Sequence, residues 1–158
     1  MTSRVLVVIG LSIGASALGS CQEHQSNEYN EKEIIDSVTA TVNKISELTV
    51  QKNIDQLMTL YADLKEFQYI DNEGIPKDLD ELREIYSNIF QSLDYIELLE
   101  NHVDVVPVNE ETAYCIWKGK EEIKMLESEK MLSSWIATII LRKIDDNWEI
   151  VHFHSTHF

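Results

Sequence analysis

The stretch Trp135 to His157, WIATIILRKIDDNWEIVHFHSTH, decides the fold that the sequence predicts. An apolar run ends at Leu141, a polar segment follows, and alternation between apolar and polar residues resumes at Trp148. β-Branched and aromatic residues on both sides of a short Asp/Asn turn are typical of a β-hairpin. The stretch therefore predicts two antiparallel strands rather than a helix.

The length of the hairpin loop decides which side chains share a face, because a slip of one residue exchanges the two faces of a strand. A two-residue loop, Asp146-Asn147, would put His152 and His154 on the face of Ile139 and Leu141. A three-residue loop, Asp145-Asp146-Asn147, would put a different set on that face: Val151, Phe153 and Ser155.

We prefer the three-residue loop for two reasons. Asn147 tolerates the left-handed conformation that the last loop position requires, and Lys143 would then face Glu149 across the strands. On this register Trp135, Ile139, Phe153 and Ser155 point to the interior. The opposite, outer face of the sheet would carry Ile136, Thr138, Ile140, Ile150 and His152.

Length and charge limit the classes of protein to consider. The 158 residues are enough for one domain with its own core. The formal net charge of −15 argues against a nucleic-acid partner, which needs a basic face. The two cysteines, Cys21 and Cys115, indicate no disulfide framework.

The N-terminus predicts a targeting segment. Arg4 precedes an apolar run from Val5 to Ala17, which is short for a membrane span and suits a secretory signal. The segment ends Leu18-Gly19-Ser20-Cys21, which resembles the lipobox of bacterial lipoproteins. The resemblance implies a signal peptide over 1–20, a lipidated Cys21 and a tether over 21–30. An ordinary cleaved signal and an uncleaved anchor are the alternatives.

Helix start signals occur at three places in the first half of the chain. Asn30 with Glu33, Asn53 with Gln56, and Asp78 with Glu81 each place a capping side chain three residues before an acidic or amide residue. The first helix should reach about Val50. The second should carry apolar residues through Tyr61 to Leu64, and a short strand should follow at 66–70.

From Leu93 the apolar period changes to two, which predicts strands over 95–99, 102–108 and 112–118 before the hairpin. The first two could form one long bent strand. Gly119 could mark a bulge, and 120–128 is ambiguous. Helices followed by antiparallel strands predict an α+β domain over 31–158, with about three helices packed on one face of a curved antiparallel sheet.

The order of elements and the final strand, Trp148-Glu149-Ile150-Val151-His152-Phe153-His154, resemble the nuclear-transport-factor-2-like superfamily. Within it the chain is most similar to SnoaL-like domains and to the association domain of calcium/calmodulin-dependent protein kinase II. The resemblance covers roughly 31–157. It implies that the sheet is cone-shaped and that its concave side, closed by the helices, holds a small-molecule cavity. That association domain lines its cavity with arginines, whose counterparts here are Ile139, Ser155 and a position near Gly119, beside Lys118 and Lys120.

The resemblance also implies possible catalysis, since the superfamily contains isomerases, cyclases and dehydratases. His152 and His154 could act as acid or base, because histidine titrates near neutrality. A zinc site on these histidines lacks a third ligand at suitable spacing, so we expect no metal and no cofactor. Four carboxylates remain unranked as catalytic candidates: Asp63, Glu66, Asp71 and Asp104. Cys115 is expected to be a buried, inert thiol.

The sequence therefore predicts a membrane-tethered, lipid-anchored module of the bacterial cell envelope. It would bind a small molecule or assemble as a homodimer or higher homo-oligomer, without catalysis. The alternative is a small isomerase-, cyclase- or hydrolase-type enzyme acting on an apolar metabolite in the same cavity. The expected cavity residues are Tyr61, Trp117, Trp135, Ile139, Phe153 and Ser155.

Overall fold

The computed structural model describes residues 29–158, so the predicted signal peptide and Cys21 lie outside the described residues. The elements follow in the order α1 (Glu31–Val50), α2 (Ile54–Met58), β1 (Gln68–Ile70), α3 (Leu79–Ser92), β2 (Leu93–Asn109), β3 (Thr112–Met125), β4 (Met131–Ile144) and β5 (Asn147–His157). The predicted α+β class is confirmed. Because the helices and strands of residues 29–158 lie between Glu31 and His157, a chain that starts at Gln22 retains the whole described fold.

All three predicted helix starts are confirmed. The side chain of Asn30 accepts a hydrogen bond from the Glu33 backbone N–H, and Asn53 accepts one from Gln56. At α3 the capping box is reciprocal, since Glu81 also accepts from the Asp78 backbone N–H. These local bonds satisfy donors that a helix terminus otherwise leaves free, which explains why sequence alone locates them.

The second helix is shorter than predicted, because it ends at Met58 and does not reach Tyr61 or Leu64. Beyond it the backbone pairs with β5: Ala62 N–H donates to Ile150 O, and Ile150 N–H donates to Leu60 O, both at 2.9 Å. This tertiary pairing replaces the helical hydrogen bonds that the apolar spacing predicts.

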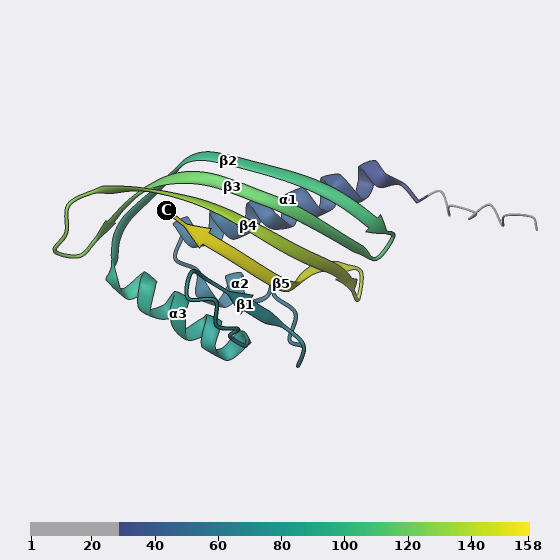
Figure 1. The fold of residues 1–158 in the computed structure, drawn as a ribbon, viewed down its shortest axis with the longest axis horizontal. Coiled ribbons are helices and arrows are strands. Elements are labelled where there is room, and N and C mark those ends of the chain that lie inside the picture. The colour runs from purple at the N-terminus through teal and green to yellow at the C-terminus, as the bar shows by residue number, and fades with distance from the viewer. Residues whose placement is uncertain (1–28) are drawn as a thin grey trace, which may run out of the picture.

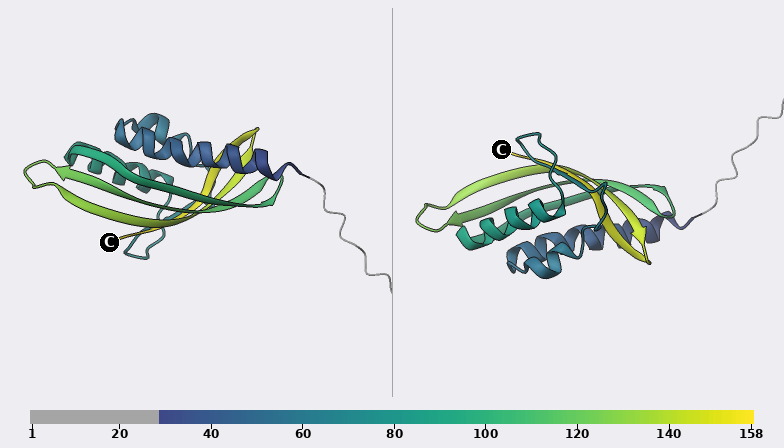
Figure 2. Two further views of the ribbon diagram at one scale, coloured as in Figure 1. Left: turned by 90° about the horizontal axis from the view of Figure 1, so that it is seen from above. Right: turned by 90° about the horizontal axis from the view of Figure 1, so that it is seen from below.

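The sheet has five strands in the order β1-β5-β4-β3-β2. Its four long strands are antiparallel to their neighbours, but β1 runs parallel to β5, so the sheet is mixed rather than wholly antiparallel. Figure 1 shows β2 to β5 as long curved ribbons crossing α1, and Figure 2 shows the helices together on one side of the bent sheet. The helices and the inner sheet face enclose the core.

The hairpin between β4 and β5 has the predicted register at its far end, but its turn differs from the prediction. Ile139 pairs with Phe153 as expected, whereas Ile144 pairs with Asn147, so the loop contains only Asp145 and Asp146. Both loop residues have positive φ, at 47° and 66°, as a two-residue turn matching the strand twist requires.

A bulge at Val151 reconciles the short turn with the register. Pairing shifts by one residue between Ile140 and Leu141, which face His152 and Ile150 respectively. As a result Ile150 is fully buried, so its predicted outward position is wrong. Val151 is only half-buried instead of joining the inner row, and the predicted opposition of Lys143 and Glu149 is also wrong.

The β2–β3 hairpin is a continuous pair of long strands, as the period-two pattern suggested. Its central bulge is at Leu99 in β2, because Leu98 pairs with Glu121 and Glu100 with Lys120. Gly119 in β3 keeps regular partners on both sides, so the prediction of a bulge at Gly119 is wrong. No helix among residues 29–158 is long and apolar enough to cross a membrane.

Candidate functional site

A cavity of about 410 Å³ opens between the inner face of the sheet and the helices α1 and α3. Its lining residues come from α1, α3, β1 and the strands β2 to β5. Figure 2 shows α1 and α3 on the same side of the bent sheet. A volume in this range is that of a site for a small organic molecule.

Aromatic rings form much of the wall. Trp117 meets Trp135 edge to face, with ring centroids 5.4 Å apart and planes at 72°. Phe153 meets Trp117 in a similar way at 6.1 Å, and Tyr69 packs against Phe153 at 5.6 Å. Edge-to-face contacts of this kind fix ring orientations, so the apolar wall is shaped before any ligand arrives.

Three buried polar atoms that belong to lining residues have no hydrogen-bond partner within 3.5 Å among the described residues: Ser46 Oγ, Trp135 Nε1 and Ser155 Oγ. Their side chains lie on α1, β4 and β5, and their residues are 8%, 6% and 2% exposed. The Ser155 hydroxyl is nevertheless close enough to the Tyr69 phenol to lower the pKa of that phenol. A buried polar group without a partner costs free energy of about 1–3 kcal/mol. Three of them around one cavity mark it as a place where polar ligand groups would be held.

Trp117 provides a contrast to Trp135. Its indole Nε1 donates to Asn101 Oδ1 at 2.6 Å, and Asn101 Nδ2 in turn donates to Asn43 on α1 at 2.8 Å. This chain ties β3, β2 and α1 together and leaves Trp117 no free donor. Trp135, equally buried, keeps its N–H available.

Glu121 is the acidic residue that lines the cavity. Burial raises the pKa of its carboxyl group, while the cross-strand Ser133 hydroxyl opposes the rise by hydrogen bonding. No lysine or arginine is among the residues that line the cavity. The carboxylate therefore stands in an apolar enclosure without a basic partner.

His157 lies at the cavity with its ring stacked on Trp135, at 6.5 Å between centroids and 29° between planes. Partial burial lowers its pKa, and the negative charge of Asp71 acts in the opposite direction. Asn72 fixes this end of β5, because its side chain donates to His157 O and accepts from His157 N–H, each at 2.8 Å. The lowered pKa favours the uncharged imidazole at neutral pH, although His157 is partly open to solvent.

Two tyrosines connect the cavity to the core behind it. The hydroxyl oxygens of Tyr61 and Tyr86 are 3.4 Å apart. Burial raises the pKa of Tyr86 to about 12, and it raises the pKa of Tyr61 as well. Both phenols therefore stay protonated at neutral pH, and they can donate hydrogen bonds but not act as bases.

The structure brings four of the six expected cavity residues to the cavity wall: Trp117, Trp135, Phe153 and Ser155. Tyr61 and Ile139 are buried in the core cluster, where neither lines the cavity. His152 and His154 face away from it, since they pair with Ile140 and Thr138 on the outer face of the sheet. These two histidines are therefore not placed for acid–base chemistry in the cavity.

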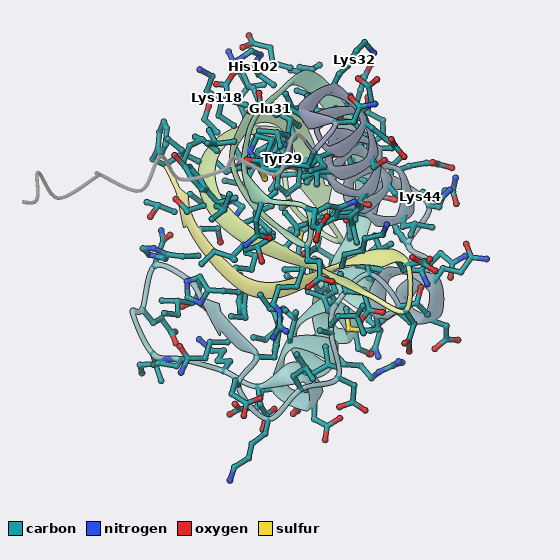
Figure 3. The ribbon with its side chains drawn as sticks, turned by 90° about the vertical axis from the view of Figure 1, so that its right-hand side faces the viewer. Tyr29, Glu31, Lys32, Lys44, His102 and Lys118 are labelled. Carbon is teal, nitrogen blue, oxygen red and sulfur yellow. The ribbon has the colours of Figure 1, made fainter. Side chains whose placement is uncertain are left out.

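The other candidates of the sequence lie outside the cavity. Asp71 forms an ion pair with Lys77 at 2.8 Å, and Asp104 lies 2.9 Å from His102 at the surface. His102 stands beside Lys118 on the outer side of the sheet (Figure 3). Asp63 and Glu66 are exposed. Among residues 29–158 no group of three or more His, Cys, Asp or Glu side chains could hold a metal ion.

Cys115 is fully buried, as predicted, and burial raises the pKa of its thiol to about 12. A thiol with so high a pKa forms almost no thiolate at neutral pH, so it is inert as a nucleophile.

Sequence analysis missed Glu121 and did not place His157 at the cavity. Glu121 lies in 120–128, where charged residues hide the alternation, but Leu98, Ile96 and Ile123 continue the inner face there. Extending the period-two pattern of β3 from Cys115 and Trp117 would have put Glu121 on the inner face. His157 follows Ser155 by two residues, so extending the predicted alternation of Phe153 and Ser155 would have put His157 on the inner face as well.

Comparison with known proteins identifies the fold. The profile of the SnoaL-like domain family matches residues 38–157. A nuclear-transport-factor-2-like superfamily protein from Salmonella enterica superposes with a TM-score of 0.70 at 14% identity, covering 80% of this chain and 92% of that one. A ketosteroid isomerase-like protein from Erwinia carotovora atroseptica gives 0.65 at 17% identity, with coverage of 82% and 98%.

A hexachlorocyclohexane dehydrochlorinase of type 2 gives a TM-score of 0.69 at 10% identity, covering 80% of this chain and 86% of that one. No curated protein sequence matches the chain. At these identities the likeness to solved structures defines the fold and leaves the chemistry to the residues of the site.

Proposed function

The chain belongs to the SnoaL-like domain family, and from that premise we propose that it binds a small, largely apolar molecule in the cavity without catalysis. The observation that carries this proposal is the set of unpartnered polar atoms of Ser46, Trp135 and Ser155 around an aromatic wall. Apolar contact would supply most of the affinity, and these groups would orient the ligand.

The test is a fluorescence titration of the chain Gln22–Phe158 with N-phenyl-1-naphthylamine, an uncharged apolar probe. Ser155→Leu adds apolar volume inside the cavity and should weaken probe binding by at least about tenfold, or about 1.4 kcal/mol. Thr156→Leu is the matched control, because Thr156 is the next residue on β5 and is exposed. Equal binding by both variants would place the probe elsewhere and contradict the proposal.

A second candidate function is proton-transfer catalysis in the same cavity, and Glu121 is the observation that favours it. A carboxyl group whose pKa is raised by burial is closer to the working range of a general acid or base. Glu121→Gln should then abolish turnover while leaving binding of an uncharged ligand intact. If Glu121→Gln lowers ligand binding and turnover by the same factor, Glu121 contributes to binding and not to proton transfer.

We also propose a lipid anchor at the N-terminus and association of the domain with further copies of itself. The Leu18-Gly19-Ser20-Cys21 sequence supports a lipid anchor in the bacterial cell envelope. An acyl-anchored module would hold the domain, and its cavity, near the membrane surface. The apolar outer face of the sheet supports a homodimer or higher homo-oligomer, since Ile136 is 44% exposed and Ile140 36%.

A further inference from the structure

The lining of the cavity carries negative charge and no compensating lysine or arginine. Glu121 is the carboxylate in its wall, and the lowered pKa of His157 favours the uncharged imidazole. The basic residues of β3 do not line the cavity. Lys118 stands opposite His102 on the outer face, Lys120 stands opposite Glu100, and Lys124 pairs with Asp94 at 2.6 Å. The charge of Glu121 would repel an anionic ligand, and the lining offers no opposite charge to compensate.

Glu121 has no cationic partner, whereas its neighbour Glu122 has one. Glu122 forms an ion pair with Lys130, whereas the partner of Glu121 is the neutral hydroxyl of Ser133. A partly buried carboxylate without a counter-charge is costly to ionise. A cationic group placed beside Glu121 would remove that cost.

The rings that surround the carboxylate suit a cation as well. Trp135 lies across Gly119, two residues before Glu121 in β3. Tyr86 is close enough to Glu121 for the charge of that carboxylate to raise the pKa of the phenol. Faces of tryptophan and tyrosine attract ammonium groups, and a desolvated site strengthens the attraction. The formal net charge of −15 would also concentrate cations around the domain.

We infer that the cavity takes an organic cation, in which an ammonium group lies beside Glu121 and an apolar body packs against Trp135 and Phe153. This inference rests on the proposed function, because it names the chemical class of the molecule that the cavity binds. The N–H of Trp135 and the hydroxyls of Ser46 and Ser155 would hold a hydroxyl or carbonyl group on the apolar body.

The test uses two probes of the same shape: (4-hydroxyphenyl)trimethylammonium and its uncharged isostere 4-tert-butylphenol. Isothermal titration of the chain Gln22–Phe158 at pH 7, where the phenol of each probe stays protonated, should give at least about tenfold tighter binding of the cation. Glu121→Gln should remove that preference, and Glu121→Asp should keep part of it. Glu122→Gln is the matched control and should retain the preference, with thermal melting to show that each variant is folded.

The outcomes separate this inference from the proposed function. If the uncharged isostere binds as tightly as the cation, the cavity still binds small molecules but the inference is overturned. If the preference survives in Glu121→Gln, the assignment to Glu121 is overturned. If neither probe binds the wild-type chain, both the inference and the proposed function are contradicted.

Discussion

The indole of Trp135 lies directly against the backbone of Gly119, its cross-strand partner. A Cβ atom on Gly119 would stand 2.4 Å from Cζ2 of Trp135 and 2.5 Å from the carbonyl oxygen of Glu100. Gly119 is therefore required for space and not for an unusual backbone conformation. The absence of a side chain at Gly119 lets the indole of Trp135 pack against the backbone of β3.

Gly119→Ala should displace Trp135 and reshape the cavity. Overpacking of this kind lowers the free energy of unfolding by about 1–3 kcal/mol, because neither the ring nor the backbone of Glu100 can yield freely. Thermal and urea denaturation of Gln22–Phe158 measure the loss, and the tryptophan emission spectrum should change. Lys118→Ala, one residue away on the exposed face, should alter neither.

The outer face of the sheet should mediate association. Ile116 and Tyr114 continue the apolar surface of Ile136 and Ile140 across β3, so one face of the sheet presents contiguous apolar side chains to solvent. Light scattering on Gln22–Phe158 should give at least the mass of a dimer.

The double variant Ile136→Glu/Ile140→Glu should lower that mass to the monomer, because it places charges in the centre of the proposed interface. Met131→Glu is the control, since Met131 is 53% exposed at the start of the same strand. A wild-type chain that is monomeric at micromolar concentration would rule out this interface.

Lipidation should occur at Cys21. Mass spectrometry of the protein from a membrane fraction should find an acylated cysteine as the first residue, because the apolar run ends in Leu18-Gly19-Ser20-Cys21. Cys21→Ser should leave the chain unprocessed or release it from the membrane. A soluble wild-type chain that begins at Gln22 or later would show that the signal is an ordinary cleaved one.

Stability should depend on pH through Glu121. Burial raises the pKa of this carboxyl in the folded chain, so between the unfolded pKa and the folded pKa the native state binds more protons than the unfolded state. Stability contributed by the protonated form is then lost as pH rises through this window. Glu121→Gln should flatten the slope of unfolding free energy against pH there, and Glu122→Gln should leave it unchanged.

The sequence predicts the features of the fold that depend on residues close together in the chain. The caps at Asn30, Asn53 and Asp78 depend on residues three positions apart, so they are readable without tertiary information. The end of α2 is different, because pairing with Ile150 breaks the helical pattern at Leu60. Only the folded chain brings those two segments together.

The hairpin shows how a correct register can follow from a wrong turn. The prediction of Ile139 opposite Phe153 assumed three loop residues, whereas the chain uses two loop residues and a bulge at Val151. A three-residue loop and a two-residue loop followed by a bulge give the same pairing beyond Val151. The predicted inner positions of Phe153 and Ser155 therefore agree with the structure. The position of Ile150 does not agree, because it lies between the turn and the bulge.

The candidate site was predictable only where the strand pattern was regular. Trp117, Trp135, Phe153 and Ser155 follow from alternation around the hairpin. Glu121 enters the cavity because the long bent hairpin of β2 and β3 extends over α3, and its curvature depends on the bulge at Leu99. No pattern in the sequence indicates that this carboxylate would share an enclosure with Trp135.

The central claim, that the cavity is the binding site, is tested most directly by the indole N–H signals of the three tryptophans in a ¹⁵N-labelled Gln22–Phe158 chain. On titration with N-phenyl-1-naphthylamine, the signal of Trp135, whose Nε1 has no protein partner, should move most. The signal of Trp117, bonded to Asn101, should move less, and that of Trp148, which does not line the cavity, should stay in place. A probe that binds and shifts Trp148 while Trp135 stays fixed would contradict the claim.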